Sequence, residues 1–523
     1  MTVDVCVYGA TAAGVVTAIT LAKRQRSVVL VEPGRHLGGM SSGGLGFTDS
    51  GNKAAIGGIS RDFYRIVGKH YGKDEQWTFE PSVAEGIYRQ WIADAGVKVL
   101  FEHRLAEVDK EAGKINRLML EHVPADASNA PGSSANLKEH AQIEASIFVD
   151  ATYDGDLLSR AKVAFTVGRE SVKQFGESLN GIRGVTPKHQ FLVPVDPYKK
   201  PGDASSGLLP LINEGDGGTP GEADHRVQAY NFRLCLTRAK DNRMPIGPPD
   251  GYDAARFEIL ARHIDGLVAA KKPVLLGMML KIDRMPNDKT DINNNGAVST
   301  DFLGESWTYP TADYDVRRKV WQQHLIYTQG LLHFLASDAR VPADVRKEMG
   351  AWGLCRDEFT DTGGWPHQMY IRESRRMVSP YVITQAVCEH KQPIDDSIGL
   401  ASYNMDSHNC QRVVQNGVVR NEGDVQVAPT GPYPVSYRAV VPDAKQCENL
   451  LVPVCLSASH IAYGSVRMEP VFMLLGESVA HAADLALETR SSVQDVNYDK
   501  LKQRLLDAGQ MLAWMGKKPV QRS

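Results

Sequence analysis

The sequence predicts an α/β protein that begins with a Rossmann-like unit of strand, turn, helix and strand and continues into a mixed α+β domain. A short apolar run with β-branched residues occupies positions 3–8, and a glycine turn follows at 9–14. Apolar residues recur at helical spacing over 15–23, and residues 28–31 form a second apolar run. This order is typical of a βαβ unit. A length of 523 residues also exceeds one ordinary core, which indicates at least two domains.

The composition excludes several classes of protein. Hydrophobic residues make up 42% and charged residues 23%, close to the globular average. The net charge of −3 provides no field for nucleic acid, and no apolar stretch reaches the ~18 residues of a membrane span. Seven cysteines without a C-x-x-C pair indicate neither a metal centre nor a disulfide framework. We expect a cytoplasmic enzyme for a small molecule, unless an export leader was removed, and the oligomeric state stays open.

The remaining elements follow from the same patterns. Helical spacing predicts a helix at 85–95, and apolar alternation predicts a strand at 97–101 and a hairpin at 105–123. A strand is expected at 143–151 and another at 450–454. Polar, proline-rich segments at 124–137 and 197–224 read as loops. Further helices are expected at 254–270, 316–336 and 469–487, with an outer helix in the last ~30 residues.

The glycine turn reads G-A-T-A-A-G. Gly9 allows the tight turn, and Gly14 allows the helix to pack closely on the strand. Thr11 replaces the middle glycine of the usual pattern, but the placement between strand and helix is the required context. Glu32 ends the second strand and supplies an acceptor for ribose hydroxyls. A purely structural glycine turn is the alternative. The residues expected at the pyrophosphate and ribose are Gly9, Thr11, Ala12, Ala13, Gly14 and Glu32.

The segment after Glu32 indicates which class of dinucleotide binds. It reads P-G-R-H-L-G-G-M, with Gly38 and Gly39 where backbone can pass close to a pyrophosphate and ribityl chain. This segment is similar to the glutathione-reductase type of FAD domain, so the resemblance implies FAD. No signature of a covalent link through a histidine or cysteine is recognised, so the FAD is expected to be bound noncovalently. Gly44, in the following S-S-G-G-L-G-F-T-D, is a further backbone approach or a flexible connection. The other residues expected to bind FAD are Pro33, Arg35, Met40, Leu105, Met468 and Met473.

Two later segments are also expected at the cofactor. V-D-A-T-Y-D-G-D ends a strand with the small residues Ala151 and Thr152, and its Asp154 either approaches the cofactor or, with Asp156, caps a helix.

Near the C-terminus, a polar turn leads into the helix expected at 469–487, whose positive end would face the flavin. His460 is a candidate for proton transfer or a structural histidine, and Tyr463 accompanies it. Arg467 either orients a substrate or pairs with Glu469.

Together with I-G-G-I-S-R-D-F-Y, W-P-H-Q-M-Y-I-R-E-S-R-R-M and S-A-S-H-I-A-Y-G-S-V-R-M-E-P, these motifs resemble a bacterial family of FAD-dependent oxidoreductases, often labelled xanthan-lyase-related. The resemblance spans nearly the whole chain. We expect an FAD-binding domain at 1–165 plus 390–490, a substrate or cap domain at 166–389 and a C-terminal helical extension at 491–523.

The predicted function is that of a dehydrogenase or oxidase, which transfers a hydride between FAD and a small polar substrate such as a polyhydroxylated compound. Either His460 or His367 is expected to take the proton that accompanies the hydride, and Arg372 offers a cation in the expected cap domain. The alternative for His367 and Arg372 is a structural role in irregular loops. A polar stretch at 289–295 either binds a polyhydroxylated ligand or stitches loops together. A lyase or isomerase using FAD transiently, a reductase, a monooxygenase and a flavin-binding protein without catalysis are the alternatives.

Overall fold

The computed structural model describes residues 1–124 and 140–516, so most of the loop expected at 124–137 lies outside the described residues. The chain divides into two compact units. Unit 1 comprises Met1–Val167, Glu373–Asp406 and Gln426–Ser523, and unit 2 comprises Gly168–Arg372 and Ser407–Val425. One boundary lies at 167/168, next to the expected 165/166, whereas the other lies at 372/373 instead of 389/390, and residues 407–425 also belong to unit 2. The division also assigns the C-terminal segment to unit 1.

Unit 1 is built on a seven-stranded sheet of β1 (Thr2–Tyr8), β2 (Val28–Glu32), β3 (Lys98–Phe101), β4 (His103–Glu111), β5 (Lys114–His122), β6 (His140–Asp150) and β22 (Leu450–Leu451). The order is β3-β2-β1-β6-β5-β4, with β22 beside β6. β3, β2, β1, β6 and β22 run parallel, whereas β4 and β5 form an antiparallel hairpin. The parallel strands therefore end at one edge, where α/β proteins bind their ligands.

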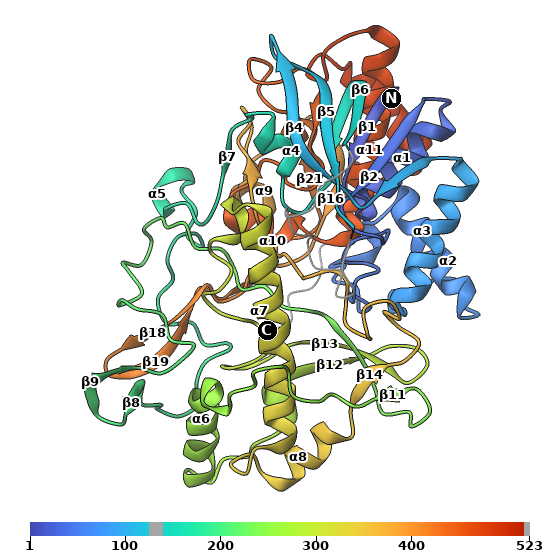
Figure 1. Cartoon of the computed structure of the whole chain (residues 1–523). Coiled ribbons are helices and arrows are strands. Elements are labelled where there is room, and N and C mark those ends of the chain that lie inside the picture. Colours follow the sequence, from blue (N-terminus) through green and yellow to red (C-terminus); the bar gives the residue numbers. More distant parts are fainter. Residues whose placement is uncertain (125–139, 517–523) are drawn as a thin grey trace. The chain divides into compact units, whose positions relative to one another are not determined.

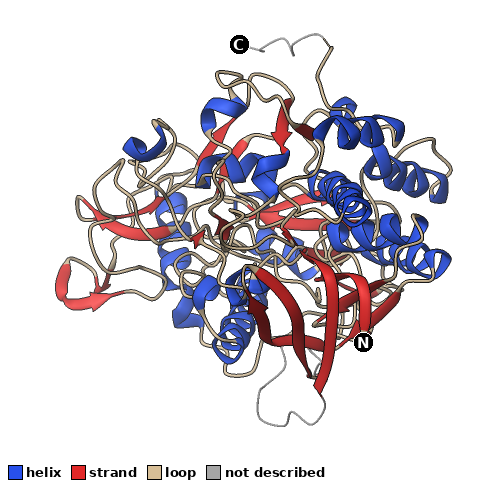
Figure 2. Ribbon diagram, turned by 90° about the horizontal axis from the view of Figure 1, so that it is seen from above, coloured by secondary structure: helices blue, strands red, loops and turns tan. Residues whose placement is uncertain are grey.

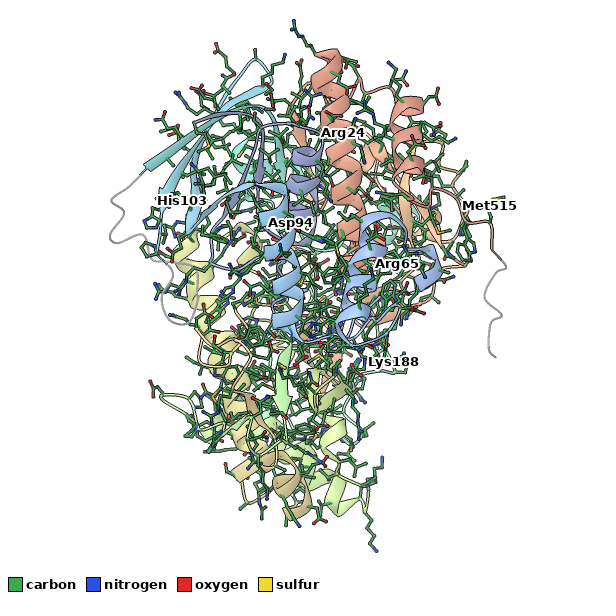
Figure 3. All side chains as sticks on the ribbon, turned by 90° about the vertical axis from the view of Figure 1, so that its right-hand side faces the viewer. Arg24, Arg65, Asp94, His103, Lys188 and Met515 are labelled. Carbon is green, nitrogen blue, oxygen red and sulfur yellow. The ribbon has the colours of Figure 1, made fainter. Side chains whose placement is uncertain are left out.

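The helices of unit 1 are α1 (Ala12–Lys23), α2 (Gly58–His70), α3 (Pro81–Ala95), α4 (Asp156–Arg160), α9 (Gln385–Cys388), α10 (His460–Val466), α11 (Glu469–Thr489) and α12 (Tyr498–Asp507). Figure 1 shows α1 beside the sheet, and α11 packs along α1. Thr17 Oγ donates to Gly476 O across this pair, at 3.0 Å. Arg24, which lies beyond the C-terminal end of α1 and is labelled in Figure 3, pairs with Asp484 of α11. Two helices far apart in sequence thus form one layer.

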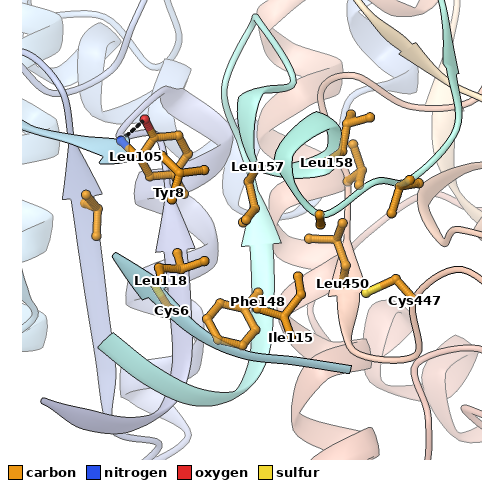
Figure 4. Close-up of a cluster of buried hydrophobic side chains, with 14 of the residues drawn as sticks. Cys6, Tyr8, Leu105, Ile115, Leu118, Phe148, Leu157, Leu158, Cys447 and Leu450 are labelled. Atoms are coloured by element: carbon orange, nitrogen blue, oxygen red, sulfur yellow. Dashed lines mark hydrogen bonds between the residues drawn. The ribbon is translucent and has the colours of Figure 1, made fainter. Parts of the chain in front are cut away.

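One apolar cluster fills the space around the sheet of unit 1. Tyr8, Leu118 and Phe148 come from three of its strands, and Leu157 comes from α4 (Figure 4). Each fully buried aliphatic or aromatic side chain of this kind contributes about 1.5–3 kcal/mol relative to exposure. The hydroxyl of Tyr8 is hydrogen-bonded within this cluster, because its Oη accepts the N–H of Leu105 at 3.0 Å. This core fixes the ends of the parallel strands.

Smaller strands complete unit 1. β7 (Phe165–Thr166) pairs with β15 (Arg376–Met377), and β16 (Ser397–Ala401) pairs with β21 (Tyr433–Ser436). Single turns of 3-10 helix lie at η1 (Lys53–Ala55) and η6 (Tyr437–Val440). β17 (Met405–Ser407) and β20 (Val425–Val427) each contain a point where the chain passes between the units.

Unit 2 contains a five-stranded antiparallel sheet in the order β11 (Arg243–Met244), β14 (Gly353–Cys355), β10 (Leu234–Thr237), β13 (Lys289–Asn294) and β12 (Leu280–Arg284). Two hairpins add β8 (Tyr198–Lys200) to β9 (Asp203–Leu208) and β18 (Gln411–Gln415) to β19 (Val418–Glu422). Its helices are α5 (Val172–Phe175), η3 (Ala254–Phe257), α6 (Glu258–Ala269), η4 (Leu276–Met278), η5 (Tyr309–Thr311), α7 (Tyr314–Ser337) and α8 (Ala343–Gly350). Figure 2 shows helices, strands and loops by colour.

Some elements of the structure differ from those that the sequence predicts. The segment 197–224 is not all loop, because β8 and β9 form a hairpin in it. The strand expected at 450–454 is paired over only two residues, since Val452 already bonds to the backbone of Val440. The sequence pattern did not predict α2, a helix of 13 residues, because its start is rich in glycine.

Among the described helices, α11 is long and apolar enough to cross a membrane. However, 94% of its apolar window is buried inside the protein. Its composition is therefore that of a core helix. It begins with a proline in the first turn, where a backbone N–H would have no acceptor within the helix.

Candidate active site

The glycine turn lies between β1 and α1 at the carboxyl edge of the sheet. Gly9 has a φ of +99°, and an added Cβ there would stand 2.8 Å from Thr152 N. A Cβ on Gly14 would overlap Gly9 O, so only glycine lets α1 approach β1 this closely. Thr11 serves as the N-cap of α1, with its Oγ1 donating to Ala151 O at 2.7 Å. Thr11 therefore ties the turn to the end of β6.

The start of α1 retains hydrogen-bonding capacity for a ligand. The N–H of Ala13, in the first turn, finds no acceptor among the described residues, although Ala13 is 0% exposed. Buried N–H groups at a helix N-terminus form a ready site for a phosphate oxygen. A pyrophosphate would satisfy this donor.

Glu32 lies at the end of β2, beside the turn. Its two carboxylate oxygens accept the N–H groups of Ala10 at 2.8 Å and Gly34 at 2.7 Å. A carboxylate has about four lone-pair positions, so it can still accept from a ribose hydroxyl. Burial raises the pKa of Glu32, and the two backbone N–H groups oppose that shift. Arg35, further along, lies 3.6 Å from Glu102.

The loop after β2 is held against the turn and against two tyrosines. Gly38 N donates to Ala10 O at 2.8 Å, and Met40 N donates to Tyr153 Oη at 2.8 Å. A Cβ added to Gly38 would lie 2.4 Å from the ring of Tyr88, whose Oη lies 3.5 Å from the sulfur of Met473 on α11. The structure thus brings the loop containing Gly38, Gly39 and Met40 next to the glycine turn.

The segment V-D-A-T-Y-D-G-D runs from β6 into α4. Asp150 accepts from Thr152 and from Leu158 N, and burial raises its pKa to about 6. The expected capping by Asp154 or Asp156 is wrong, because Gly155 is the N-cap residue and no side chain caps α4. Asp156 instead pairs with Arg375 at 2.7 Å. Asp150, at the end of β6 and outside the helix, holds the start of α4 by accepting the N–H of Leu158.

His460 begins α10 and forms a buried pair with an acid. Its Nδ1 lies 2.7 Å from Oε2 of Glu373, and the two side chains are 1% and 0% exposed. Arg376 approaches the same Glu373 oxygen at 3.4 Å and donates to Ala458 O. A histidine oriented in this way through Nδ1 exchanges protons through Nε2. The sequence suggested His460 but not Glu373, whose only signal was its place in the I-R-E-S-R-R motif.

Arg467 ends the same short helix. It donates to the carboxylate of Asp406 at 2.9 Å, so the expected alternative of a pair with Glu469 is wrong. Glu469 accepts instead from Tyr153 and Ser41. Tyr463, one turn before Arg467, donates to Val454 O at 3.3 Å, and burial raises its pKa well above the ordinary value. Glu373, Asp406, Ser41 and Tyr153 are the residues that the sequence reading did not assign.

In unit 2, Arg372 belongs to a cluster around one acid. Asp301 lies 2.9 Å from the Arg372 guanidinium and 2.8 Å from Nδ1 of His408. Burial alone would raise the pKa of Asp301, but these two neighbours hold it below the ordinary value. Arg372 also donates to Ala229 O. His367 packs edge-on against Phe359, with ring centroids 5.6 Å apart.

The polar stretch at 289–295 serves the sheet of unit 2. Lys289 pairs with Glu358 at 2.7 Å, and Asp291 forms a two-pronged pair with Arg233. Asn293 accepts from Asn231 at 3.1 Å. These contacts favour the structural interpretation of the stretch over a ligand site.

The turn, the acid at the end of β2 and the loop behind it define a dinucleotide-binding enzyme of the α/β class. The chain belongs to the family of FAD dependent oxidoreductases, which it matches over residues 4–505. No curated protein matches the chain. The family binds FAD, and its members are oxidoreductases, so this protein is an FAD-dependent enzyme.

Solved flavoprotein structures are also similar to part of the chain. THI4 of Thermovibrio ammonificans is 19% identical over 32% of this chain and 66% of its own, with a TM-score of 0.23. The flavin-dependent brominase Bmp2 is 15% identical over 38% and 51%, with a TM-score of 0.24. The bacillithiol disulfide reductase Bdr of Staphylococcus aureus is 13% identical over 33% and 42%, with a TM-score of 0.20. The chain thus spans about two thirds or less of each of these proteins.

Proposed function

We propose that the enzyme transfers a hydride between FAD and a small polar substrate, with His460 moving the accompanying proton. The pairing of His460 with Glu373 carries this proposal, because it combines a fixed ring orientation with a buried acid. In the glutathione-reductase type of fold that the sequence resembles, a helix such as α11 points its N-terminal end at the flavin, and this would place residues 460–469 near the ring. The residues therefore support dehydrogenase or oxidase chemistry in unit 1.

FAD would be held noncovalently by the carboxyl edge of the main sheet. The N–H of Ala13 and the first turn of α1 face the pyrophosphate, and Glu32 accepts from the ribose. FAD, when bound, supplies an acceptor and a donor of hydride. Gly38, Gly39 and Met40 would line its path toward the ring.

Glu373 acts as the positioning residue of the dyad. Its carboxylate accepts from His460 Nδ1 and so selects the tautomer whose Nε2 takes a proton. Arg376 compensates the charge of Glu373 and stiffens it through its own bond to Ala458 O. Arg467, held by Asp406, provides a fixed cation for a substrate hydroxyl or carboxylate.

For the substrate, the proposal is a small polar molecule. Unit 2, taken by itself, offers a cation in Arg372, whose guanidinium Asp301 keeps in place, and a ring in His367. A neutral or anionic hydroxylated compound suits this set of donors. We propose the same compartment as the sequence predicted, the cytoplasm, where seven free thiols stay reduced.

The test is anaerobic mixing of the purified protein with sugars, polyols, amines and hydroxy acids. Absorbance near ~450 nm that bleaches with one compound class would identify the oxidative half-reaction. A protein that stays yellow with every compound, yet catalyses a redox-neutral conversion, would move the assignment to a lyase or isomerase.

His460→Gln tests the dyad directly. We expect the rate of bleaching to fall at least ~100-fold while the FAD spectrum is retained, because general acid–base catalysis contributes about 10²–10⁴-fold. His481→Gln is the control, since His481 is also a buried histidine of unit 1 but lies on α11 beside Arg24 and Arg504. Unchanged bleaching in His460→Gln would remove His460 from the proton transfer.

A further inference from the structure

Glu469 stands where three segments meet that the sequence assigned to the cofactor separately. Its Oε1 accepts from Tyr153 Oη at 2.8 Å, and its Oε2 accepts from Ser41 Oγ at 2.9 Å. Tyr153 Oη in turn accepts the N–H of Met40. One carboxyl thus joins the loop after β2, the segment after β6 and the first turn of α11.

We propose that Glu469 is a positioning residue for FAD that also sets the charge at the flavin-facing end of α11. The inference rests on the proposed placement of the flavin ring at that helix end. It extends the proposed function, because the charge next to the ring affects how readily the flavin accepts electrons.

The surroundings of Glu469 leave its charge uncompensated. The side chain is 2% exposed, and no ion pair of Glu469 occurs within residues 1–124 and 140–516. Arg467, two residues before it, is held by Asp406. The two hydrogen bonds from Tyr153 and Ser41 favour the anion, as does the N-terminal end of the helix dipole, whose effect is modest.

The other ionisable groups facing this carboxyl are Tyr153, Tyr88 of α3 and Tyr64 of α2. Burial raises the pKa of all three phenols above the ordinary value, so they keep their protons. Burial likewise raises the pKa of Glu469, to about 7, despite the bonds from Tyr153 and Ser41. Within this group, Glu469 is the side chain that changes charge near neutral pH.

The sign of the effect follows from Coulomb's law. Above pH 7 the ionised carboxylate opposes the extra negative charge of a reduced flavin, and below pH 7 the neutral acid does not. Glu469→Gln keeps the size and can keep both hydrogen bonds, since an amide oxygen accepts from Tyr153 and an amide N–H donates to Ser41. The variant is therefore fixed in the neutral state.

The experiment is a dye-mediated anaerobic redox titration of the FAD in the holoenzyme at pH 5.5 and pH 8.5. We expect Glu469→Gln to raise the midpoint potential at pH 8.5 and to match the wild type at pH 5.5. Glu477→Gln is the matched control, because Glu477 lies on the same helix with its pKa also raised by burial to about 7, but bonds to Gln510 and Ile59 N. It should match the wild type at both pH values.

Ser41→Ala tests the positioning role without changing the acid. We expect at least ten-fold weaker FAD binding in an equilibrium titration. The pH dependence of the potential should remain but move to higher pH, because the hydrogen bond that is lost lowers the pKa of Glu469 in the wild type. Equal potentials for Glu469→Gln and wild type at both pH values would overturn the inference on charge, and unchanged FAD affinity in Ser41→Ala would overturn the positioning role. Neither measurement uses a substrate, so a failure of the proposed reaction would be seen separately.

Discussion

Glu32 shows how one side chain organises the nucleotide end of the site. Its carboxylate accepts the N–H groups of Ala10 and Gly34, on both sides of β2's end, while remaining able to accept from a ribose. The two bonds together require that both side-chain oxygens of residue 32 accept a hydrogen bond. An amide at this position would place an N–H against one of the two backbone donors.

Glu32→Gln is therefore expected to weaken FAD binding about ten-fold or more. A buried N–H left without an acceptor costs about 1–3 kcal/mol, and ten-fold in affinity corresponds to about 1.4 kcal/mol. Titration of the apoprotein with FAD measures this. Glu144→Gln, on the exposed side of β6, should bind FAD as the wild type does. Equal affinities of Glu32→Gln and wild type would place the ribose elsewhere.

The cysteines make a second prediction at the residue scale. All seven are buried and free, and burial raises the pKa of the thiols of Cys6, Cys235, Cys447 and Cys455. Since the thiolate is the reactive form, both effects suppress reaction. At pH 8 we expect no rapid reaction of the native protein with an aromatic disulfide reagent and seven equivalents after denaturation. A fast-reacting thiol in the native protein would contradict the burial.

At the scale of elements, the crossing of α1 and α11 sets the position of the glycine turn. A Cβ on Gly476 of α11 would overlap Ala13 O and lie 3.0 Å from Ala13 Cα. α11 therefore touches α1 in the turn that we propose to face the pyrophosphate. Any side chain at 476 must push the two helices apart.

Gly476→Ala is expected to destabilise the protein by about 1–3 kcal/mol, the usual range for overpacking, and to weaken FAD binding. Gly86→Ala is the control, because Gly86 lies in α3 with no atom within 4 Å of the added Cβ. That change should stabilise by about 0.5–1 kcal/mol, the helix-propensity difference. Chemical denaturation of both variants decides the matter, and a neutral Gly476→Ala would show that α11 can shift freely.

The elements that the sequence predicted well are those whose pattern is local. The βαβ unit, the hairpin of β4 and β5 and the long α7 and α11 all have clear periodicity. β13 reads K-T-D-I-N-N, so its strand character depends on Arg233 and Glu358, which are far away in sequence. The same limit applies to the site. Glu373 is 87 residues from His460, and no local signal pairs them.

At the scale of the whole molecule, the two units carry buried titratable groups of opposite kinds. In unit 1, burial raises the pKa of Asp150 to about 6 and those of Glu469 and Glu477 to about 7. In unit 2, burial lowers the pKa of His263 and His324 to about 4. Each of these groups prefers its neutral form in the folded protein.

This arrangement predicts opposite pH responses of the apoprotein. The raised carboxyls contribute stability below their unfolded pKa of about 4 and lose it as pH rises to 7. The lowered histidines contribute fully above about 6.5 and lose their contribution as pH falls toward 4. Burial lowers the pKa of His481 in unit 1 to about 4, so this one histidine opposes the trend set by the three carboxyls of that unit.

Between pH 5 and pH 7 we therefore expect unit 1 to become less protected against amide exchange and unit 2 more protected. The measurement is hydrogen exchange by mass spectrometry, corrected for the intrinsic pH dependence of exchange. The double variant Glu469→Gln, Glu477→Gln should flatten the response of unit 1 alone. Parallel responses of the two units would contradict the assignment.

The interrupted path of unit 1 along the chain has a consequence for its synthesis. β1, α1 and β6 leave the ribosome early, but β22 and α11, which complete their sheet and cover α1, follow about 300 residues later. At about 5–20 residues per second, the first segment waits roughly 15–60 s for its missing strand and helix. During that time the apolar faces that α11 will cover have no native partner. The nascent chain is thus a client for chaperones until translation is almost finished, and the FAD turn takes its final form among the last events of synthesis.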